Sequence, residues 1–149
     1  NSAPEVTLED VKLYPTSISG AFKENFGRLF RALGDQAKYT SFIEPIAVAR
    51  KPLPWDVLRA ITRMTKKEFY TTLYRCGLLL VTKGEQVQFV HKRMYDWLKG
   101  AETTVMIDGL EAELGVDDER GHQLLADFCV EHKEHPFALE HGVFHLQYL

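Results

Sequence analysis

The chain has 149 residues, a formal net charge of −3 and 45% hydrophobic residues, a composition that excludes an intrinsically disordered protein. No apolar run approaches the roughly 20 residues that a bilayer-spanning helix needs. No secretory signal opens the sequence, and two cysteines, Cys76 and Cys129, are too few for a disulfide framework, so we expect a cytoplasmic protein without membrane contact. The chain starts with Asn1 rather than Met, which we interpret as a segment of a longer polypeptide.

The charges are distributed unevenly along the chain. Residues 1–49 carry five basic and six acidic side chains, residues 50–100 carry eleven and four, and residues 101–149 carry two and eleven. The change of sign near Gly100 predicts two structural units. We expect the basic middle to face the acidic tail, an anionic ligand or another domain.

Residues 1–36 predict a lead-in followed by one helix. Pro4 and Pro15 indicate an irregular segment that ends near residue 17. Over residues 18–33 the apolar side chains recur on one helical face, and Gly34 follows at the position of a helix C-cap.

The next helix has two alternative starts, which the sequence leaves open. Ser41 and Glu44 have the spacing of a capping box, which would place Pro45 in the first turn. A start near Lys38 would instead place Pro45 at a kink inside the helix.

Two further helices are expected before residue 77. Pro54 suits the first position of a short helix that ends near Arg63. Thr65 and Glu68 have capping-box spacing and open a helix that Gly77 closes.

The hydrophobic period then changes from helix to strand. Residues 78–81 predict a buried strand, Lys83 and Gly84 a turn, and residues 86–89 a second strand. A helix over residues 92–99 follows. We therefore predict a mainly α fold in which residues 37–100 form a winged-helix domain with a small β-hairpin wing.

Residues 101–149 are expected to form a small acidic helical linker unit. A short helix is predicted around residues 109–114, and Asp117 caps a longer one from Asp118 to about His132. Pro136 opens a last helix that is apolar almost all round, which is typical of a helix packed against something on most sides.

Motifs for nucleotide or acyl chemistry are absent from the sequence. It contains no G-x-x-x-x-G-K-[ST], no G-x-G-x-x-G and no G-x-S-x-G. We predict that the chain by itself is not an enzyme and holds no cofactor.

Two pairs of residues raise the hypothesis of a zinc site. Cys129 and His132 are three residues apart, and His141 and His145 are four apart, so each pair lies on one helical face. The alternative is that the cysteine is a small core residue and the histidines are polar groups of the core or an interface. We favour this alternative and expect no metal.

The basic middle raises the hypothesis of an anion or nucleic-acid surface. In a winged helix, the third helix is the one that enters a DNA major groove. The candidate phosphate contacts are Arg59, Arg63, Lys66, Lys67 and Arg75. That helix is rich in Phe and Tyr and lacks Asn and Gln for reading bases, so a solvated or domain-facing surface is the favoured alternative.

One stretch resembles a known family. The run FVHKRMYDWL, which contains His91, is similar to the FxHKSFxDWL signature of the winged-helix domain of STAND-class NTPases of the NACHT type. YTSFIEPIAVARKPLPWDVL, LYPTSISGAF, GHQLLADFC and ALEHGVFHL also resemble family patterns, in the family's order. The resemblance covers most of the chain from Leu13 onward and is strongest to scaffold proteins with ankyrin or WD repeats.

The resemblance implies a regulatory role. In this family a nucleotide-binding core precedes the winged helix and a repeat array follows it, and ADP or ATP binds in the parent protein. The position matching the family's ADP-contacting histidine is His91, while Arg93 and Met94 replace the usual Ser and Phe. We expect a non-catalytic segment that couples core and repeats and whose partners are other domains and proteins. The alternatives are a stand-alone winged-helix nucleic-acid-binding domain and a module that dimerises or docks a peptide through its acidic tail.

Overall fold

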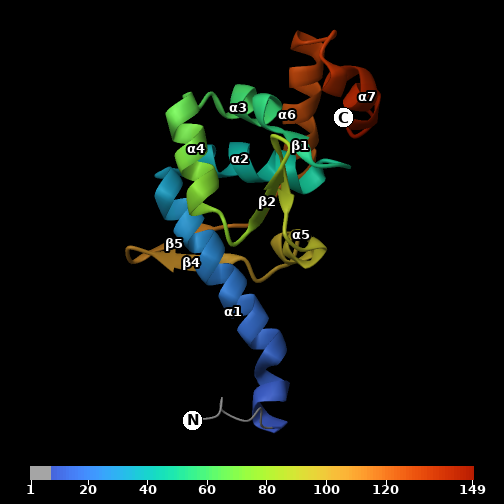
Figure 1. Cartoon of the computed structure of the whole chain (residues 1–149). Coiled ribbons are helices and arrows are strands. Elements are labelled where there is room, and N and C mark those ends of the chain that lie inside the picture. The colour runs from blue at the N-terminus through green and yellow to red at the C-terminus, as the bar shows by residue number, and fades with distance from the viewer. Residues whose placement is uncertain (1–7) are drawn as a thin grey trace.

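The computed structural model describes the backbone of residues 8–149 and the side chains of residues 18–149. Within this range the chain is mainly helical, with seven α-helices and two small antiparallel sheets (Figure 1). The prediction of a mainly α fold is therefore confirmed. No described helix is both long enough and apolar enough to cross a bilayer.

Helix α1 spans Leu8–Leu33, and its N-terminal half extends away from the body of the molecule (Figure 1). The prediction of an irregular segment to residue 17 is wrong for residues 8–17, because the helix continues through Pro15. A proline removes one helical hydrogen bond and need not end a long helix. Pro4 lies outside the described residues. Gly34, at φ +82°, ends the helix as predicted.

Helix α2 spans Gln36–Val48 and lies at the centre of the fold. Asp35 caps it by accepting a hydrogen bond from the Lys38 amide at 2.7 Å. The start at Ser41 is therefore wrong, because the stronger cap lies six residues earlier, and Pro45 lies inside the helix as in the other alternative.

Helices α3 (Trp55–Thr62) and α4 (Lys66–Arg75) follow close to their predicted bounds. The turn between them passes through Arg63, which is left-handed at φ 59°. The capping box of α4 is present, since Thr65 and Glu68 each accept a hydrogen bond from the other's backbone amide.

A three-stranded antiparallel sheet lies beside these helices in the order β1-β3-β2, formed by Leu53–Pro54, Gln86–Phe89 and Leu80–Lys83. The hairpin β2–β3 was predicted, but β2 starts two residues later because residues 77–79 continue as turns after α4. The hairpin turn is at Gly84 and Glu85, which both have positive φ, rather than at Lys83 and Gly84. Strand β1 was not predicted.

Helix α5 (Lys92–Leu98) packs on α1 through Trp97, whose ring stacks on that of Phe26 with the ring centroids 5.6 Å apart. A second hairpin follows, formed by β4 (Thr104–Ile107) and β5 (Leu110–Glu113). The predicted helix over residues 109–114 is therefore wrong. Asp108 and Gly109 both have positive φ and make the tight turn that joins two strands, and a helix cannot continue through that geometry.

Helices α6 (Asp118–Glu131) and α7 (Pro136–Leu146) form an antiparallel pair at the end of the chain. Asp117 caps α6 as predicted. We call residues 36–100 the central unit and residues 101–149 the tail unit. One continuous hydrophobic core joins them, running from Phe26 of α1 through Phe42 of α2 to Leu125 and Phe137 of the tail unit.

Candidate functional site

The contact between α2 and α6 contains a buried carboxylate. Glu44 of α2 is only 1% exposed, and its Oε2 accepts a hydrogen bond from the Asp117 backbone amide at 2.5 Å. Arg120 Nη1 lies 3.9 Å from Oε1, an atom that has no hydrogen-bond partner among the described residues. Burial raises the pKa of Glu44, while the Asp117 amide and Arg120 act in the opposite direction. The acidic side chain thus fixes the first turn of α6 against the central helix.

Gly121 allows the two helices to touch at this point. A Cβ atom there would lie 2.7 Å from the Glu44 carbonyl oxygen and 2.9 Å from Val48 Cγ2. Contacts this short do not occur, so any larger residue would force α6 away from α2. A second link is close by, where the buried Tyr39 hydroxyl donates to the Leu114 carbonyl oxygen at 3.0 Å. We call the contact around Glu44 and Gly121 the carboxylate junction.

The contact between α6 and α7 contains a pair of buried histidines. Nδ1 of His122 and Nδ1 of His145 are 2.8 Å apart, so one ring donates a hydrogen bond and the other accepts it. The Tyr148 ring stacks on His122 at 3.9 Å. Burial lowers the pKa of His122, and it lowers the pKa of His145 to about 4. The pair is therefore neutral at pH 7, and its hydrogen bond would be lost only if both rings were protonated, since both Nδ1 atoms would then be donors.

Arg50 connects the central unit to α7, next to the pair of buried histidines. Its guanidinium lies 4.1 Å above the Phe144 ring, and Nη2 donates to His141 Nδ1 at 3.0 Å. Because an arginine only donates, His141 accepts at Nδ1 and carries its proton on Nε2, which faces Glu140 at 3.5 Å. We call the contact formed by His122, His145, His141 and Arg50 the histidine junction.

Ion pairs explain part of the uneven charge distribution. Lys51 pairs with Glu140 at 2.9 Å, and Lys99 pairs with Asp118 at 3.2 Å. Asp56 of α3 lies 2.6 Å from His135, just before α7. Two cations of the basic middle, Lys51 and Lys99, therefore face carboxylates of the acidic tail, one of the three partners that the sequence left open.

His91 lies at the exit of β3, where it is the N-cap residue of α5 and is exposed. Its side chain does not cap the helix. The ring is therefore presented at the surface, and its nucleotide contact remains a prediction.

The five predicted anion contacts do not converge on one surface. Arg59 and Lys66 line a cavity of about 230 Å³ between α3 and α4. Lys67 and Arg75 line another on the opposite side of α4. Arg63 lines a third together with Asp127 and Glu131 of α6, where an anionic ligand would meet two carboxylates.

The four zinc candidates are not brought together. His141 and His145 make the contacts given above, while His132 is exposed and stacks on Phe128 at 4.5 Å. Cys129 is buried, and burial raises the pKa of its thiol. Within residues 18–149, no three His, Cys, Asp or Glu side chains are grouped to hold a metal ion.

Sequence reasoning did not single out His122 as a functional residue. A signal was present, since His122, Leu125, Ala126 and Cys129 recur at i, i+3, i+4 and i+7, and all four are buried. A histidine on such a buried stripe needs a hydrogen-bond partner inside the protein, as His122 has in His145.

The outer face of α7 is apolar and exposed. Leu139 and Val143 are 75% and 77% exposed and, with Leu146, lie at i, i+4 and i+7. The opposite face, with Phe137 and His145, is buried against α6. The sequence predicted that this helix is packed on most sides. Among the described residues, only one face of α7 is packed.

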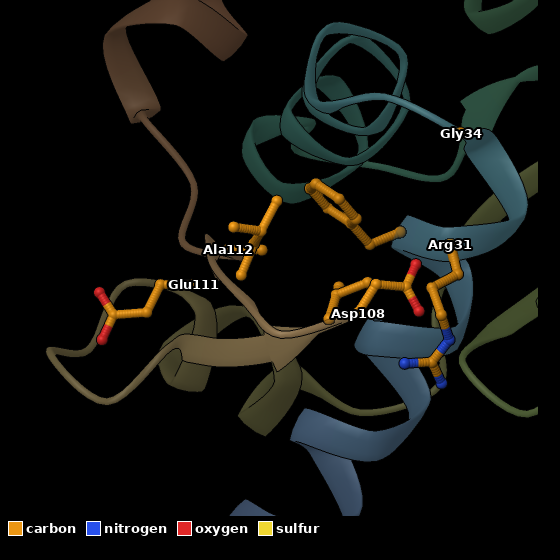
Figure 2. Close-up of a pocket in the computed structure, with 8 residues that line it drawn as sticks. Arg31, Gly34, Asp108, Glu111 and Ala112 are labelled. Atoms are coloured by element: carbon orange, nitrogen blue, oxygen red, sulfur yellow. The ribbon is translucent and has the colours of Figure 1, made fainter.

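A separate cavity of about 380 Å³ lies between the end of α1 and the β4–β5 hairpin. Phe30, Ile107 and Leu110 contribute its apolar lining. Figure 2 shows Arg31 and Asp108 turned toward each other and Glu111 pointing away. These charges do not converge on a common point, so the cavity shows no arrangement selective for an ionic ligand.

Comparisons with protein-family models, with curated proteins and with solved structures found no match for this chain.

Proposed function

We propose that the chain is a non-catalytic regulatory and coupling module of a NACHT-like signalling or scaffold protein, in which it joins a nucleotide-binding core to a repeat array in the cytoplasm. The observation that carries the proposal is the way in which the tail unit is attached. The carboxylate junction and the histidine junction tie α6 and α7 to the central unit, while α7 keeps an apolar face outward. A rigid body with an exposed apolar end is suited to pass a rotation from one neighbour to another.

The winged-helix assignment belongs to this proposal. The order α2, β1, α3, α4, β2, β3 and the antiparallel sheet order β1-β3-β2 support it. Helices α3 and α4, joined by a short turn, have the connection of a helix-turn-helix motif. In this assignment β2 and β3 are the wing, and His91 follows the wing directly.

The coding sequence around the chain tests the proposal. The proposal predicts that the gene encodes a G-x-x-x-x-G-K-[ST] loop within about 300 residues before Asn1 and a repeat array after Leu149. A gene that encodes neither would contradict the proposed family.

A nucleotide-retention measurement on the encoded protein tests the role of His91. The proposal predicts that His91→Ala weakens the retention of ADP by about tenfold, since it removes a hydrogen bond to a charged group. Lys83→Ala, on the exposed wing, is the matched control and should retain ADP as the natural protein does. Equal retention by both variants would exclude this role.

The nucleic-acid alternative receives less support. It requires phosphate contacts on one face, whereas Arg59, Lys67 and Arg63 line three different cavities. Affinity for a short DNA duplex that falls steeply with added salt would favour it over the coupling role.

A further inference from the structure

A cavity of about 230 Å³ lies where α4 packs against the end of α1, close to the start of α2 (Figure 1). We call it the α4 pocket. Leu33 and Met64 contribute to its apolar lining. Its charged and hydroxyl-bearing lining residues include Lys38, Lys67, Glu68, Thr71 and Arg75. Three cations and one carboxylate thus surround a single cavity, which gives the lining a formal charge of +2.

The spacing along α4 directs two of these cations to the same cavity. Lys67, Thr71 and Arg75 lie at i, i+4 and i+8 and form one exposed stripe. Residues four apart on a helix are neighbours, so Thr71 lies between the two cations. Lys38 lines the same cavity from α2. Within residues 18–149 none of the three cations forms an ion pair.

The carboxylate of the pocket is already engaged. Glu68 Oε1 accepts a hydrogen bond from the Thr65 backbone amide at 3.2 Å, as part of the capping box of α4. Hydrogen bonds from Thr65 lower the pKa of Glu68, and the charge of Lys38 acts in the same direction. Glu68 therefore offsets part of the charge of Lys38, whereas Lys67 and Arg75 have no counter-charge among the described residues.

This lining matches a phosphate monoester better than a carboxylate. At pH 7 a phosphate monoester carries about two negative charges and three acceptor oxygens. It can accept from lysine, arginine and a hydroxyl at the same time. A carboxylate brings one charge and two oxygens, so one of the free cations would stay unmatched.

A nucleic-acid backbone fits the same surface less well. It presents a row of phosphates and needs cations along its path. On the other side of α4, however, Arg59 and Lys66 share their cavity with Asp56 and Glu85. The excess of positive charge is confined to the α4 pocket, which suits one phosphate group.

We propose that the α4 pocket binds a phosphate monoester, with Lys67 and Arg75 donating to its oxygens, Thr71 donating from between them and Lys38 adding its charge from α2. This inference does not depend on the proposed family. Two sources supply the group, namely a phosphorylated serine or threonine of a partner protein and a small phosphate in solution. A phosphorylated segment would also contact the apolar lining at Leu33.

Two probes distinguish the sources. Inorganic phosphate and a capped peptide with one phosphoserine are titrated separately into the ¹⁵N-labelled chain at constant ionic strength, while backbone amide resonances are followed by NMR. We expect saturable shifts of the Thr71 and Arg75 amides with both probes. Tighter binding of the peptide assigns the pocket to a phosphorylated protein, and equal affinity assigns it to a small phosphate. The same peptide with glutamate in place of phosphoserine should bind about tenfold more weakly.

Two adjacent lysines provide matched variants. Lys67→Gln should weaken binding about tenfold because it removes a charge-assisted hydrogen bond, and Arg75→Gln should do the same. Lys66→Gln removes the same charge one residue earlier, but Lys66 lines the cavity on the other side of α4, so affinity should stay within about twofold. Lys67 is exposed and its side chain takes no part in the cap of α4, so Lys67→Gln keeps the test valid if Arg75→Gln fails to fold.

Four results would overturn the proposal. They are the absence of a saturable shift with either probe, equal losses in Lys66→Gln and Lys67→Gln, equal binding of the glutamate peptide, and tighter binding of a short DNA duplex than of the phosphoserine peptide at the same salt concentration. Equal losses in the two lysine variants would show a general attraction of anions to α4 and no specific pocket.

Discussion

The carboxylate junction and the histidine junction hold the same tail unit by different physical means. At the first, Gly121 lets two backbones touch and Glu44 accepts from an amide at the start of α6. At the second, neutral imidazoles, aromatic rings and Arg50 hold α7. Protonation of His141 at Nδ1 would remove the acceptor for Arg50, and protonation of both His122 and His145 would remove the acceptor between them. The first contact depends on shape and responds to added volume, whereas the second depends on protonation and responds to pH. The tail unit is therefore held by close packing at α2 and by protonation-sensitive contacts at α7.

The largest effect is expected from Gly121→Ala. The new Cβ would meet the Glu44 carbonyl oxygen at 2.7 Å, and backbone cannot move aside as a flexible side chain can. We expect the free energy of unfolding to fall by about 3 kcal/mol, as measured by urea denaturation. Gly20→Ala is the matched control, because Gly20 lies in α1 with open space around it, and it should be neutral or stabilising. Equal stability of both variants would show that α6 does not touch α2 closely.

Acidification should weaken the histidine junction next. The folded pKa of His145 is lowered to about 4 from 6.5, so between these values the unfolded chain binds more protons than the folded chain. Stability from this group is fully present above pH 6.5 and is lost as the pH falls toward 4. We expect the free energy of unfolding to fall by about 2 kcal/mol as the pH is lowered from 6.5 to 4.

The matched comparison for this pH effect is His145→Gln against His91→Gln. The first should flatten the pH profile, because it removes the buried titrating ring, and the second should leave it unchanged, because His91 is exposed. A profile that is as steep in His145→Gln as in the natural chain would locate the titration elsewhere.

A smaller effect is expected when Arg50 is replaced. Arg50→Gln loses the contact with the Phe144 ring at 4.1 Å and the bond to His141, and should cost about 1 kcal/mol in thermal or urea unfolding. Lys51→Gln removes only an exposed ion pair with Glu140 and should change stability by less than about 0.5 kcal/mol. If the two variants were equally stable, Arg50 would be a surface cation and not part of the junction.

The smallest effect is expected on the outer face of α7. Val143→Lys should leave the free energy of unfolding within about 0.5 kcal/mol of the natural value, because the side chain is 77% exposed. On the inner face, Phe137→Ala should cost about 3 kcal/mol. A large loss of stability in Val143→Lys would show that the outer face is covered.

Local signals in the sequence were sufficient for most helices. The capping box of Thr65 and Glu68, the Asp117 cap and the stop at Gly34 all act within a few residues, and the structure has them where they were predicted. The hairpin β2–β3 was predicted from a short apolar run, a turn at a glycine and the period of two in residues 86–89.

Local signals failed where a short segment was assigned the wrong type of secondary structure, and where contacts between segments distant in the chain determine the structure. Asp108 and Gly109 are a strong hairpin turn, but a short helix around residues 109–114 was predicted there instead. Strand β1 has two residues and exists only because β3 lies beside it. The contact of Gly121 with Glu44 joins residues that are far apart in the chain, and no local pattern indicates it.

The attachment of the tail unit is tested most directly by native-state hydrogen exchange. If the two junctions tie the tail unit to the central unit, the amides of α6 should open with the same free energy and the same denaturant dependence as those of α2. Opening of α6 and α7 at a much lower free energy, while α2 stays protected, would contradict the account.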